Sequence, residues 1–559
     1  MRTAVTIILA GMTFTACKSP TPEQSATPPA TTTAPAAADP KVAQLMPGMG
    51  NHHHPMATTN PEAQRFFDQG FDLVFGFNHE EAVRSFTRAA ELDPKASMPH
   101  WGIAWALGPN YNLDVDDDRA VQANAAIAQA IALSKNGPEV ERAYIDAMAI
   151  RFPGDGKPAR AALARKYASA MRDVSRRYPD DLDAATLYAE SLMNLRAWKL
   201  WSLDGKPAEG TEEIVSVLES VLARDPVHLG ANHYYIHTVE ASRTPSRALP
   251  SAVRLDTLAP AAGHLTHMPA HIYARVGDQA AAARANEAGA RADREYFKRA
   301  PADGFYGLAY YPHNLHFLAD SEMMRGRLAA ARVAADEVAT TMAPHTKMMP
   351  MVESLITMKT AVLLRFGRDD EILALPQPPA DHPVEVAWWH FARGIALART
   401  HKVDDAAKAR MALTEALGKV PEDALFGGTG LATARSIVAL AATVLDARIA
   451  WARDSHDEAI RTWKKAVASA DEVPYDEPPV FFYPVRESLG AALLLSGKVD
   501  NAERVFRDDL LKHPGNARSL FGLEQTLRKQ KRDADAEWVK RAFDKAWADA
   551  DTTLTVEGL

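Results

Sequence analysis

The feature that most constrains the fold is a pattern of small residues and proline that recurs with a period of 34 residues. In the stretch that begins at Ala63, positions 8, 20, 24, 27 and 32 are Gly70, Ala82, Phe86, Ala89 and Pro94. Parts of the pattern recur in stretches that begin at Leu229, Gly263 and Tyr483. Small residues at this spacing let two antiparallel helices approach closely, and proline cannot continue the second helix. The sequence therefore predicts repeated helix pairs.

These positions resemble those of the tetratricopeptide repeat family, and the resemblance covers most of residues 60 to 545. It implies an all-α fold, a right-handed superhelix of about nine to twelve stacked antiparallel helix pairs with a concave groove. Alanine-rich runs such as 280–283 favour helix, in agreement with this fold. The chain also resembles uncharacterised bacterial repeat lipoproteins through its HHHP segment and its GHLTHMPAHIY stretch, and that resemblance suggests no function.

Two stretches interrupt the period of the repeat. One runs from about Trp198 to Gly210, and the other from about Phe297 to Tyr311, with the repeat resuming at Pro312. Insertions between repeats map to loops on one face of such a stack. We therefore expect two loops on the rim of the superhelix.

Residues 1–16 have the pattern of a bacterial signal peptide. Arg2 supplies the positive charge, residues 5–12 form the apolar segment, and Ala16 is the small residue before Cys17. The arrangement resembles a lipobox, in which the cysteine is acylated and becomes the first mature residue. The apolar run is well short of the ~20 residues of a membrane-spanning helix. Cys17 is also the only cysteine, which excludes internal disulfides and cysteine-ligated zinc.

The composition divides the rest of the chain into three parts. Residues 17–58 are rich in Thr, Pro, Ala and Ser, which predicts a lipidated, disordered tether with a His- and Met-rich end. The helical repeat domain spans 59–545, and a C-terminal tail spans 546–559. The lipid anchor implies a place in the bacterial cell envelope facing the periplasm, with the membrane as one partner, and Lys18 favours the outer membrane over the inner one.

The charge of the chain and its motifs exclude several function classes. Lys and Arg number 63 against 71 Asp and Glu, a net charge of −8, so nucleic acid is not an expected partner. The sequence has no HExxH, P-loop, GxSxG or Rossmann motif. Any chemistry must therefore come from another constellation of residues.

Histidine supplies that constellation, because seven of the 19 histidines lie between residues 233 and 316. They are His233, His237, His264, His267, His271, His313 and His316, at positions 2, 5 or 9 of three first helices, with Glu240 at position 12. In tetratricopeptide repeats these positions generally line the concave groove. Neighbouring first helices pack about 8–10 Å apart, so their imidazoles can converge. We expect His237, His264 and His313 to lie within about 5 Å of one another.

The chemistry of these side chains favours a transition metal, with zinc or copper as the candidate cofactor. Neutral imidazole binds both ions, and a carboxylate such as Glu240 suits a catalytic site. Two other interpretations stay open, a polar groove for a peptide or an anion, and structural hydrogen bonding. Pro269, within the histidine-rich stretch, should kink a helix or start one, which affects the aim of His271.

A second histidine group, His52, His53 and His54, is flanked by Met46, Met49 and Met56. Imidazole and thioether together suit copper, so these histidines are an additional candidate metal site. A low-complexity histidine tract is the alternative interpretation. A third is that this segment threads the groove and supplies further ligands.

Three functions fit these observations. The first is a membrane-anchored extracytoplasmic scaffold whose histidine-lined groove binds a transition metal or a metal-dependent ligand. The second is a metal-dependent hydrolase that uses the same residues, with a metal-bound water as nucleophile and Glu240 as general base. The third is a metal-free scaffold that holds a protein or peptide partner in the groove. The sequence does not decide whether the chain is an enzyme.

Overall fold

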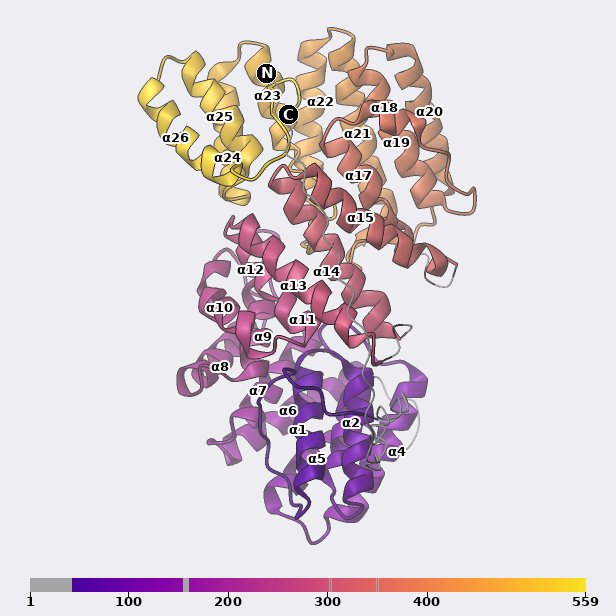
Figure 1. Cartoon of the computed structure of the whole chain (residues 1–559), viewed down its shortest axis with the longest axis vertical. Helices are drawn as coiled ribbons and strands as arrows, with labels where there is room; N and C mark the ends of the chain where they lie inside the picture. The colour runs from indigo at the N-terminus through magenta and orange to yellow at the C-terminus, as the bar shows by residue number, and fades with distance from the viewer. Residues whose placement is uncertain (1–42, 154–159, 301, 303, 348, 350) are drawn as a thin grey trace, which may run out of the picture. The chain divides into compact units, whose positions relative to one another are not determined.

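The computed structural model of the chain describes residues 43–153, 160–300, 302, 304–347, 349 and 351–559. The predicted signal peptide, Cys17 and the first part of the predicted tether lie outside these residues. The described residues belong to one compact unit, and its helices succeed one another as antiparallel pairs (Figure 1). The all-α fold of stacked helix pairs predicted from the sequence is confirmed.

The helices group into twelve pairs within the described part of the chain. The first six are α1 (Pro61–Phe75) with α2 (His79–Leu92), α3 (Met98–Leu107) with α4 (Asp117–Ser134), α5 (Glu139–Arg151) with α6 (Arg160–Arg177), α7 (Leu182–Met193) with α8 (Thr211–Arg224), α9 (Leu229–Val239) with α10 (Leu249–Leu258), and α11 (Gly263–His267) and α12 (Pro269–Arg275) with α13 (Gln279–Tyr296). The other six are α14 (Phe305–Met324) with α15 (Leu328–Met342), α16 (Val352–Ile356) and α17 (Met358–Arg365) with α18 (Asp369–Ala374), α19 (Pro383–Arg399) with α20 (Val403–Lys419), α21 (Ala434–Ala452) with α22 (His456–Asp471), α23 (Arg486–Leu495) with α24 (Val499–Lys512), and α25 (Ala517–Lys529) with α26 (Asp533–Ala546).

Short elements complete the described structure. They are the 3-10 helices η1 (Asn194–Arg196), η2 (Pro245–Ala248) and η3 (Ala343–His345), and the antiparallel strands β1 (Leu425–Phe426) and β2 (Ala432–Thr433). Among the residues placed by the structure, no helix has the length and apolar character needed to cross a membrane.

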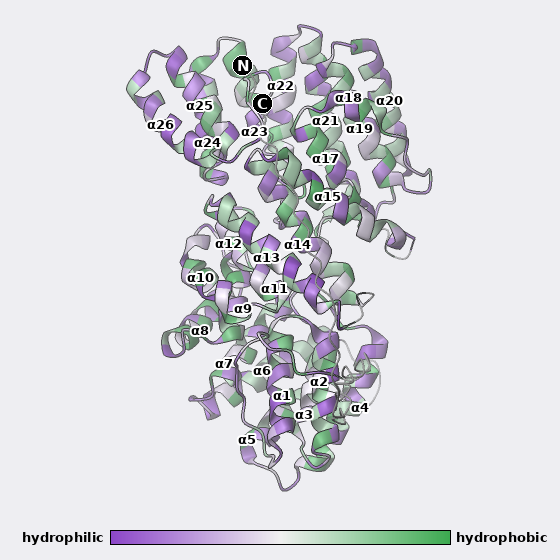
Figure 2. Ribbon diagram, in the orientation of Figure 1, coloured by the Kyte–Doolittle hydropathy of each residue, from purple (hydrophilic) through white to green (hydrophobic). Residues whose placement is uncertain are grey.

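Two large hydrophobic cores and a small third one lie along the stack, and α14 contributes to all three. Its residue Phe317 belongs to the first core, which extends from Ala43, and its residue Ala319 belongs to the second, which extends to Leu559. Figure 2 shows hydrophobic stretches along the helices of both halves and hydrophilic stretches on outer helices such as α26. Burial between neighbouring pairs thus replaces a single central core.

The phenylalanine at position 24 of the repeat packs between glycines of two neighbouring helices, which explains the recurring spacing within the repeat. The ring of Phe86 on α2 lies between Gly70 of α1 and Gly102 of α3, and a Cβ at Gly102 would come within 2.6 Å of the ring. Phe506 on α24 occupies the same kind of space between Gly490 and Gly522. Both rings are completely buried. Glycine is required because a side chain at these positions would overlap the ring.

Removing one of these rings should destabilise the stack strongly. Phe506→Ala should lower the free energy of unfolding by roughly 3–5 kcal/mol, because it leaves a ring-sized cavity between two rigid helices. Leu511→Ala on the same helix, where the side chain is 82% exposed, is the matched control and should change it by less than about 0.5 kcal/mol. Chemical denaturation measures both values. Equal effects of the two substitutions would contradict this packing role.

The structure confirms one predicted insertion and corrects the other. Residues 198–210 form a loop between η1 and α8, closed by a backbone bridge between Trp201 and Pro207. Residues 305–311, by contrast, form the first turns of α14, and Pro312 lies inside that helix instead of starting it. The helix extends past the proline because Tyr306, Tyr310 and Tyr311 are buried, which outweighs the one backbone hydrogen bond that proline cannot donate.

Residues 43–58, here called the N-terminal segment, pack against the helices. Met49, His54 and Met56 are buried, and the amide of Ala261 donates to the carbonyl of Gly48 at 2.9 Å. The described part of the predicted tether is therefore ordered along the folded domain. Composition alone predicted disorder for this stretch, but two of its methionines are buried against the helices.

Candidate metal centres

The predicted histidines occupy three neighbouring first helices of the pairs. His233 and His237 lie on α9, His264 and His267 on α11, and His271 on α12. His313 and His316 follow on α14, one turn apart. Pro269 divides the middle helix, since α11 ends at His267 and α12 begins at the proline, as the sequence predicted.

The groove that these positions were expected to line is closed. His233 and His267 are completely buried, and His237, His264 and His271 are exposed by 2% or less. The turn after α1 covers them, because Phe77 contacts the rings of His233 and His264 at centroid distances of 4.6 and 5.3 Å. These five histidines therefore face the interior, whereas His313 and His316 on α14 are only partly buried.

His233, His237 and His264 form a first triad, with one ring nitrogen of each within 4.8 Å of the others. The Nδ1 of His233 donates to the carbonyl of Phe75 at 2.5 Å, and the Nδ1 of His237 donates to Glu240 at 2.9 Å. Both Nε2 atoms are buried without a hydrogen-bond partner, as are both ring nitrogens of His264. Three ring nitrogens with free lone pairs thus lie within 4.8 Å of one another. Each unsatisfied buried group costs about 1–3 kcal/mol.

Burial keeps the imidazoles of this triad neutral. Desolvation, followed by the neighbouring His237, lowers the pKa of His233 well below its usual value. Desolvation and then His233 have the same effect on the pKa of His264. Burial also lowers the pKa of His237, although Glu240 opposes the shift. Neutral imidazole is the form that ligates a metal ion.

His267, His271 and His313 form a second triad with the same closeness of ring nitrogens. The Nδ1 of His267 donates to Asn286 at 2.6 Å, and the Nδ1 of His271 donates to Glu240 at 2.5 Å. The two Nε2 atoms then lie only 2.8 Å apart. Two lone pairs at that distance repel each other unless a proton or a cation lies between them.

Glu240 connects the two triads. One carboxylate oxygen accepts from His237 and the other from His271. Burial alone would raise the pKa of Glu240, but His271 and His237 outweigh it and hold the pKa at about 2. A carboxylate whose two oxygens orient two imidazoles is a supporting group of the kind that surrounds metal sites. Both oxygens already accept hydrogen bonds, so Glu240 is poorly placed to serve as a general base.

The grouping differs from the expected trio of His237, His264 and His313. His264 joins His233 and His237, while His313 packs on His267 at a ring-centroid distance of 4.7 Å. The division follows the packing of the helices, since His267 on α11 and His271 on α12 both lie beside His313, with ring centroids 4.7 and 5.7 Å from it. His316 belongs to no cluster of metal-ligating groups among the described residues, and burial lowers its pKa to about 4.

Sequence reasoning missed one carboxylate beside the second triad. Glu477, in the loop between α22 and α23, has an oxygen within 4.8 Å of His271 and Glu240. Burial raises the pKa of Glu477 to about 8, even though His271 opposes the shift. It lies more than 200 positions along the chain from both residues, so no local spacing could have indicated it.

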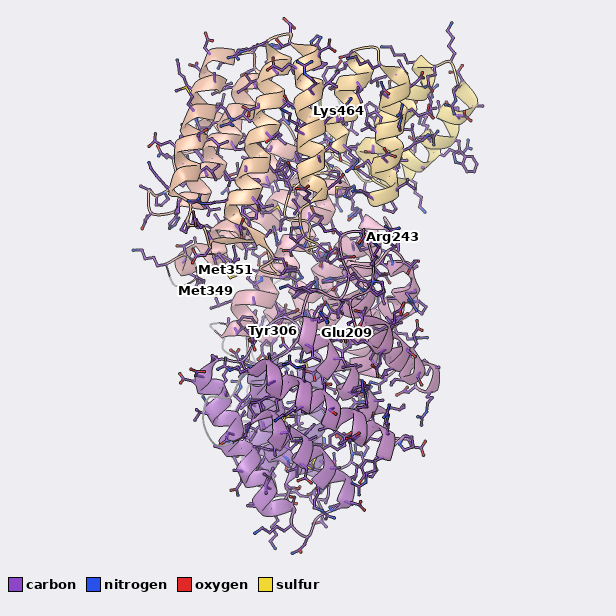
Figure 3. All side chains as sticks on the ribbon, turned by 180° about the vertical axis from the view of Figure 1, so that it is seen from behind. Glu209, Arg243, Tyr306, Met349, Met351 and Lys464 are labelled. Carbon is purple, nitrogen blue, oxygen red and sulfur yellow. The ribbon has the colours of Figure 1, made fainter. Side chains whose placement is uncertain are left out.

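A large cavity lies near the first triad, and two of its lining residues contact His237. Its volume is about 1100 Å³, and Tyr111 and Trp198, which line it, pack on the ring of His237 at centroid distances of 5.2 and 5.7 Å. Glu209, labelled in Figure 3, also lines this cavity. Tyr306, labelled there too, accepts from the amide of His264 at 3.1 Å.

The second histidine group does not converge as three ligands. His53 points away and its Nδ1 contacts Asp68 at 2.8 Å, with 61% of its side chain exposed. His52 and His54 instead reach Asp183 on α7, at 2.9 and 2.7 Å. His228 joins them at 3.2 Å. Asp183 and His228 are residues that the sequence analysis did not select.

The tautomer of His228 favours hydrogen bonding over metal binding at this cluster. His228 caps α9, and its Nδ1 accepts from the amide of Ala231 at 3.2 Å. Its Nε2 therefore carries the proton and faces Asp183 as a donor. We assign His52, His54, His228 and Asp183 as a buried polar latch that fixes the N-terminal segment.

The stability of the latch should depend on pH because His52 titrates. Burial lowers the pKa of His52, but Asp183 outweighs it and raises the pKa from 6.5 to about 9. A raised folded pKa contributes stability that is complete below pH 6.5 and is lost as pH rises through 9. Proteolysis of the N-terminal segment should therefore be slow near pH 6 and faster above pH 9, relative to cleavage elsewhere. Equal protection at both values would contradict the ion pair.

Asp183→Asn should release the latch at every pH. Removing one partner of a buried ion pair typically costs about 3–5 kcal/mol, so the free energy of unfolding should fall by that order. The matched control is Asp180→Asn, since the Asp180 side chain is 99% exposed and its ion pair with Arg224 contributes little. Denaturation curves and limited proteolysis of the two variants test the assignment. If the N-terminal segment of Asp183→Asn resists proteolysis as well as that of the unaltered chain, the latch assignment is wrong.

Comparison with known proteins finds only remote structural likeness. No protein-family model matches the chain, and no curated protein is detectably similar in sequence. Solved structures similar to this chain include a human IFIT1 dimer with m7Gppp-AAAA (TM-score 0.34, 12% identity, 88% of this chain and 92% of that one). Others are yeast Tom70 (0.27, 11%, 88% and 91%) and the P58(IPK) TPR domain (0.20, 10%, 84% and 98%). At these TM-scores the likeness carries no argument about what the chain binds.

Proposed function

We propose that the chain is a helical-repeat scaffold that binds transition-metal ions in two buried trihistidine centres. The first triad carries the proposal, because its buried imidazoles bring ring nitrogens without hydrogen-bond partners within 4.8 Å of one another. A protein core rarely keeps several unpaired polar atoms together without a ligand for them. The carbonyl of Phe75 and the carboxylate of Glu240 hold the opposite nitrogens as donors, the arrangement that orients histidine ligands.

The donor set suits zinc or copper. Imidazole binds both ions, and each triad supplies three nitrogens and no thiolate. Anchoring at Cys17 and a place in the periplasm belong to the same proposal and rest on the sequence alone. They are consistent with the metal chemistry but independent of it.

Metal analysis of the protein tests the proposal directly. The chain without residues up to Cys17 is purified without an affinity histidine tag, exposed to zinc or copper, dialysed, and analysed by mass spectrometry. We expect about two ions per chain, one for each triad. Fewer than about 0.1 ion per chain with both metals would overturn the proposal.

One observation favours a second candidate, metal-dependent hydrolysis. Glu477 lies beside the second triad, where His313 is partly exposed, whereas both oxygens of Glu240 are engaged. Glu477, whose pKa burial raises to about 8, would be the general base in place of Glu240 at pH values above 8. Zinc-loaded protein should then hydrolyse a p-nitrophenyl ester, and Glu477→Gln should abolish this activity while both ions stay bound. Activity unchanged by Glu477→Gln would exclude that role.

A further inference from the structure

Four arginines from the second half of the stack meet in one groove, here called the arginine groove. They are Arg365 of α17, Arg399 of α19, Arg448 of α21 and Arg518 of α25. All four helices are first helices of their pairs, so the groove is the inner surface of consecutive repeats. Unlike the histidines, these side chains border an open cavity of about 510 Å³.

The arginines outnumber the carboxylates that pair with them. Glu487, completely buried, binds Arg365 and Arg518, and Asp369 lies 3.4 Å from Arg399. Among the described residues no carboxylate side chain forms an ion pair with Arg448. Two side-chain carboxylates thus face four guanidinium groups, and buried guanidinium groups are costly unless further acceptors complete their pairing.

The pKa values of two of these arginines are lowered. Desolvation, followed by the nearby Arg365, lowers the pKa of Arg518 to about 9. Desolvation and then Arg399 lower the pKa of Arg448 to about 10. Each guanidinium therefore lies in a setting where an added negative charge would be stabilising.

Residues 552–559, here called the tail segment, occupy part of this groove. The carbonyl oxygen of Leu559 accepts from Arg448 at 2.8 Å and from Ser488 at 2.9 Å, and the carbonyl of Gly558 accepts from Arg518. The Leu559 side chain is 2% exposed, and Glu557 lines the cavity beside it. The groove thus recognises peptide carbonyls, an aliphatic side chain and a nearby acid.

The tail segment is held at its two ends and by Val556, which packs against the second core. Thr552 donates to the carbonyl of Gly326 at 2.9 Å, while Thr553, Thr555 and Glu557 between the ends are exposed. Few contacts would have to break for the tip at Gly558 and Leu559 to leave. A segment with a low local opening free energy can be replaced by a competing ligand.

We propose that the arginine groove is a binding site for an acidic peptide segment that carries an aliphatic residue at the position of Leu559, and that the tail segment is its intramolecular occupant. The tail competes at a high effective concentration, on the order of millimolar for a short tether. An external peptide therefore binds when the tail segment binds the arginine groove less tightly. This site is separate from both histidine triads.

The test uses the full chain and a fluorescein-labelled peptide with the sequence of residues 552–559. Leu559→Lys weakens the tail, because lysine removes the buried aliphatic contact and is repelled by the arginines. We expect fluorescence anisotropy to show at least tenfold tighter peptide binding to Leu559→Lys than to the unaltered chain. Adding Arg448→Leu, or Arg399→Gln if that variant does not fold, should reduce the binding at least tenfold again.

The control is Arg435→Leu in the Leu559→Lys chain, because Arg435 lies on the same helix as Arg448 but bonds Val420 and Glu422 outside the groove. It should leave peptide binding unchanged. Three results would overturn the proposal. They are equal binding by the unaltered and Leu559→Lys chains, binding that does not depend on the groove arginines, and full competition by inorganic phosphate, which would indicate a simple anion site.

Discussion

Replacing His264 with alanine should leave the chain with one bound ion instead of two. His264 is the only residue of the first triad that comes from α11, and both of its ring nitrogens lack a hydrogen-bond partner. The two remaining imidazoles cannot hold an ion that three hold, and we expect affinity at this centre to fall by at least about 100-fold. Mass spectrometry after saturation with zinc and dialysis gives the stoichiometry, and circular dichroism reports on the fold.

His316→Ala is the matched control for that experiment. It removes a partly buried histidine of the same histidine-rich region that belongs to neither triad, and both ions should stay bound. If His264→Ala retains two ions, the first triad is not a metal site. If it retains none, the two triads act as one unit instead of two centres.

Glu240→Gln should weaken both centres at once. The amide has one acceptor oxygen, so it can accept from His237 or from His271 but not from both, and the other imidazole loses its orienting partner. Loss of such a supporting group typically reduces metal affinity by about 10–100-fold. Competition with a zinc chelator measures the affinity of each centre.

The matched control is Glu219→Gln on α8. Glu219 is a half-exposed carboxylate that bonds Tyr235 and Arg247 far from either triad's ring nitrogens. It should leave both affinities unchanged. A Glu240→Gln chain that resists the chelator as well as the unaltered one would show that Glu240 does not support metal ligands.

The sequence predicted the helix pairs because their packing rests on local spacing. Gly70 and Phe86 belong to one pair, and their separation is fixed by the length of two helices and a turn. The same frame placed seven histidines on inward-facing positions, and the structure puts all of them on first helices of the pairs. Periodicity reports which face of a helix a residue occupies, and that part of the site followed from it.

Other parts of the site depend on contacts between distant segments, which periodicity does not contain. Closure of the groove by Phe77 and the approach of Glu477 to His271 arise from packing between separate pairs. His264 and His313 belong to different triads because of how α9, α11, α12 and α14 pack together, which local spacing does not indicate. Asp183 binds His52 and His54, which lie more than 100 residues earlier in the chain, and no motif near Asp183 indicates this contact.

The ring of Phe86 needs the space left by glycines in two successive helix pairs. The two ends of a helix pair are therefore not equivalent when pairs are exchanged between repeat proteins. A transplanted pair brings its own phenylalanine and the glycine at position 8, but the second glycine stands in the pair that follows. Gly102 and Gly522 each lie 32 residues after the first glycine of their set. Recombination between repeat proteins is therefore restricted at the C-terminal boundary of such a module, where a matching glycine must already be present in the recipient.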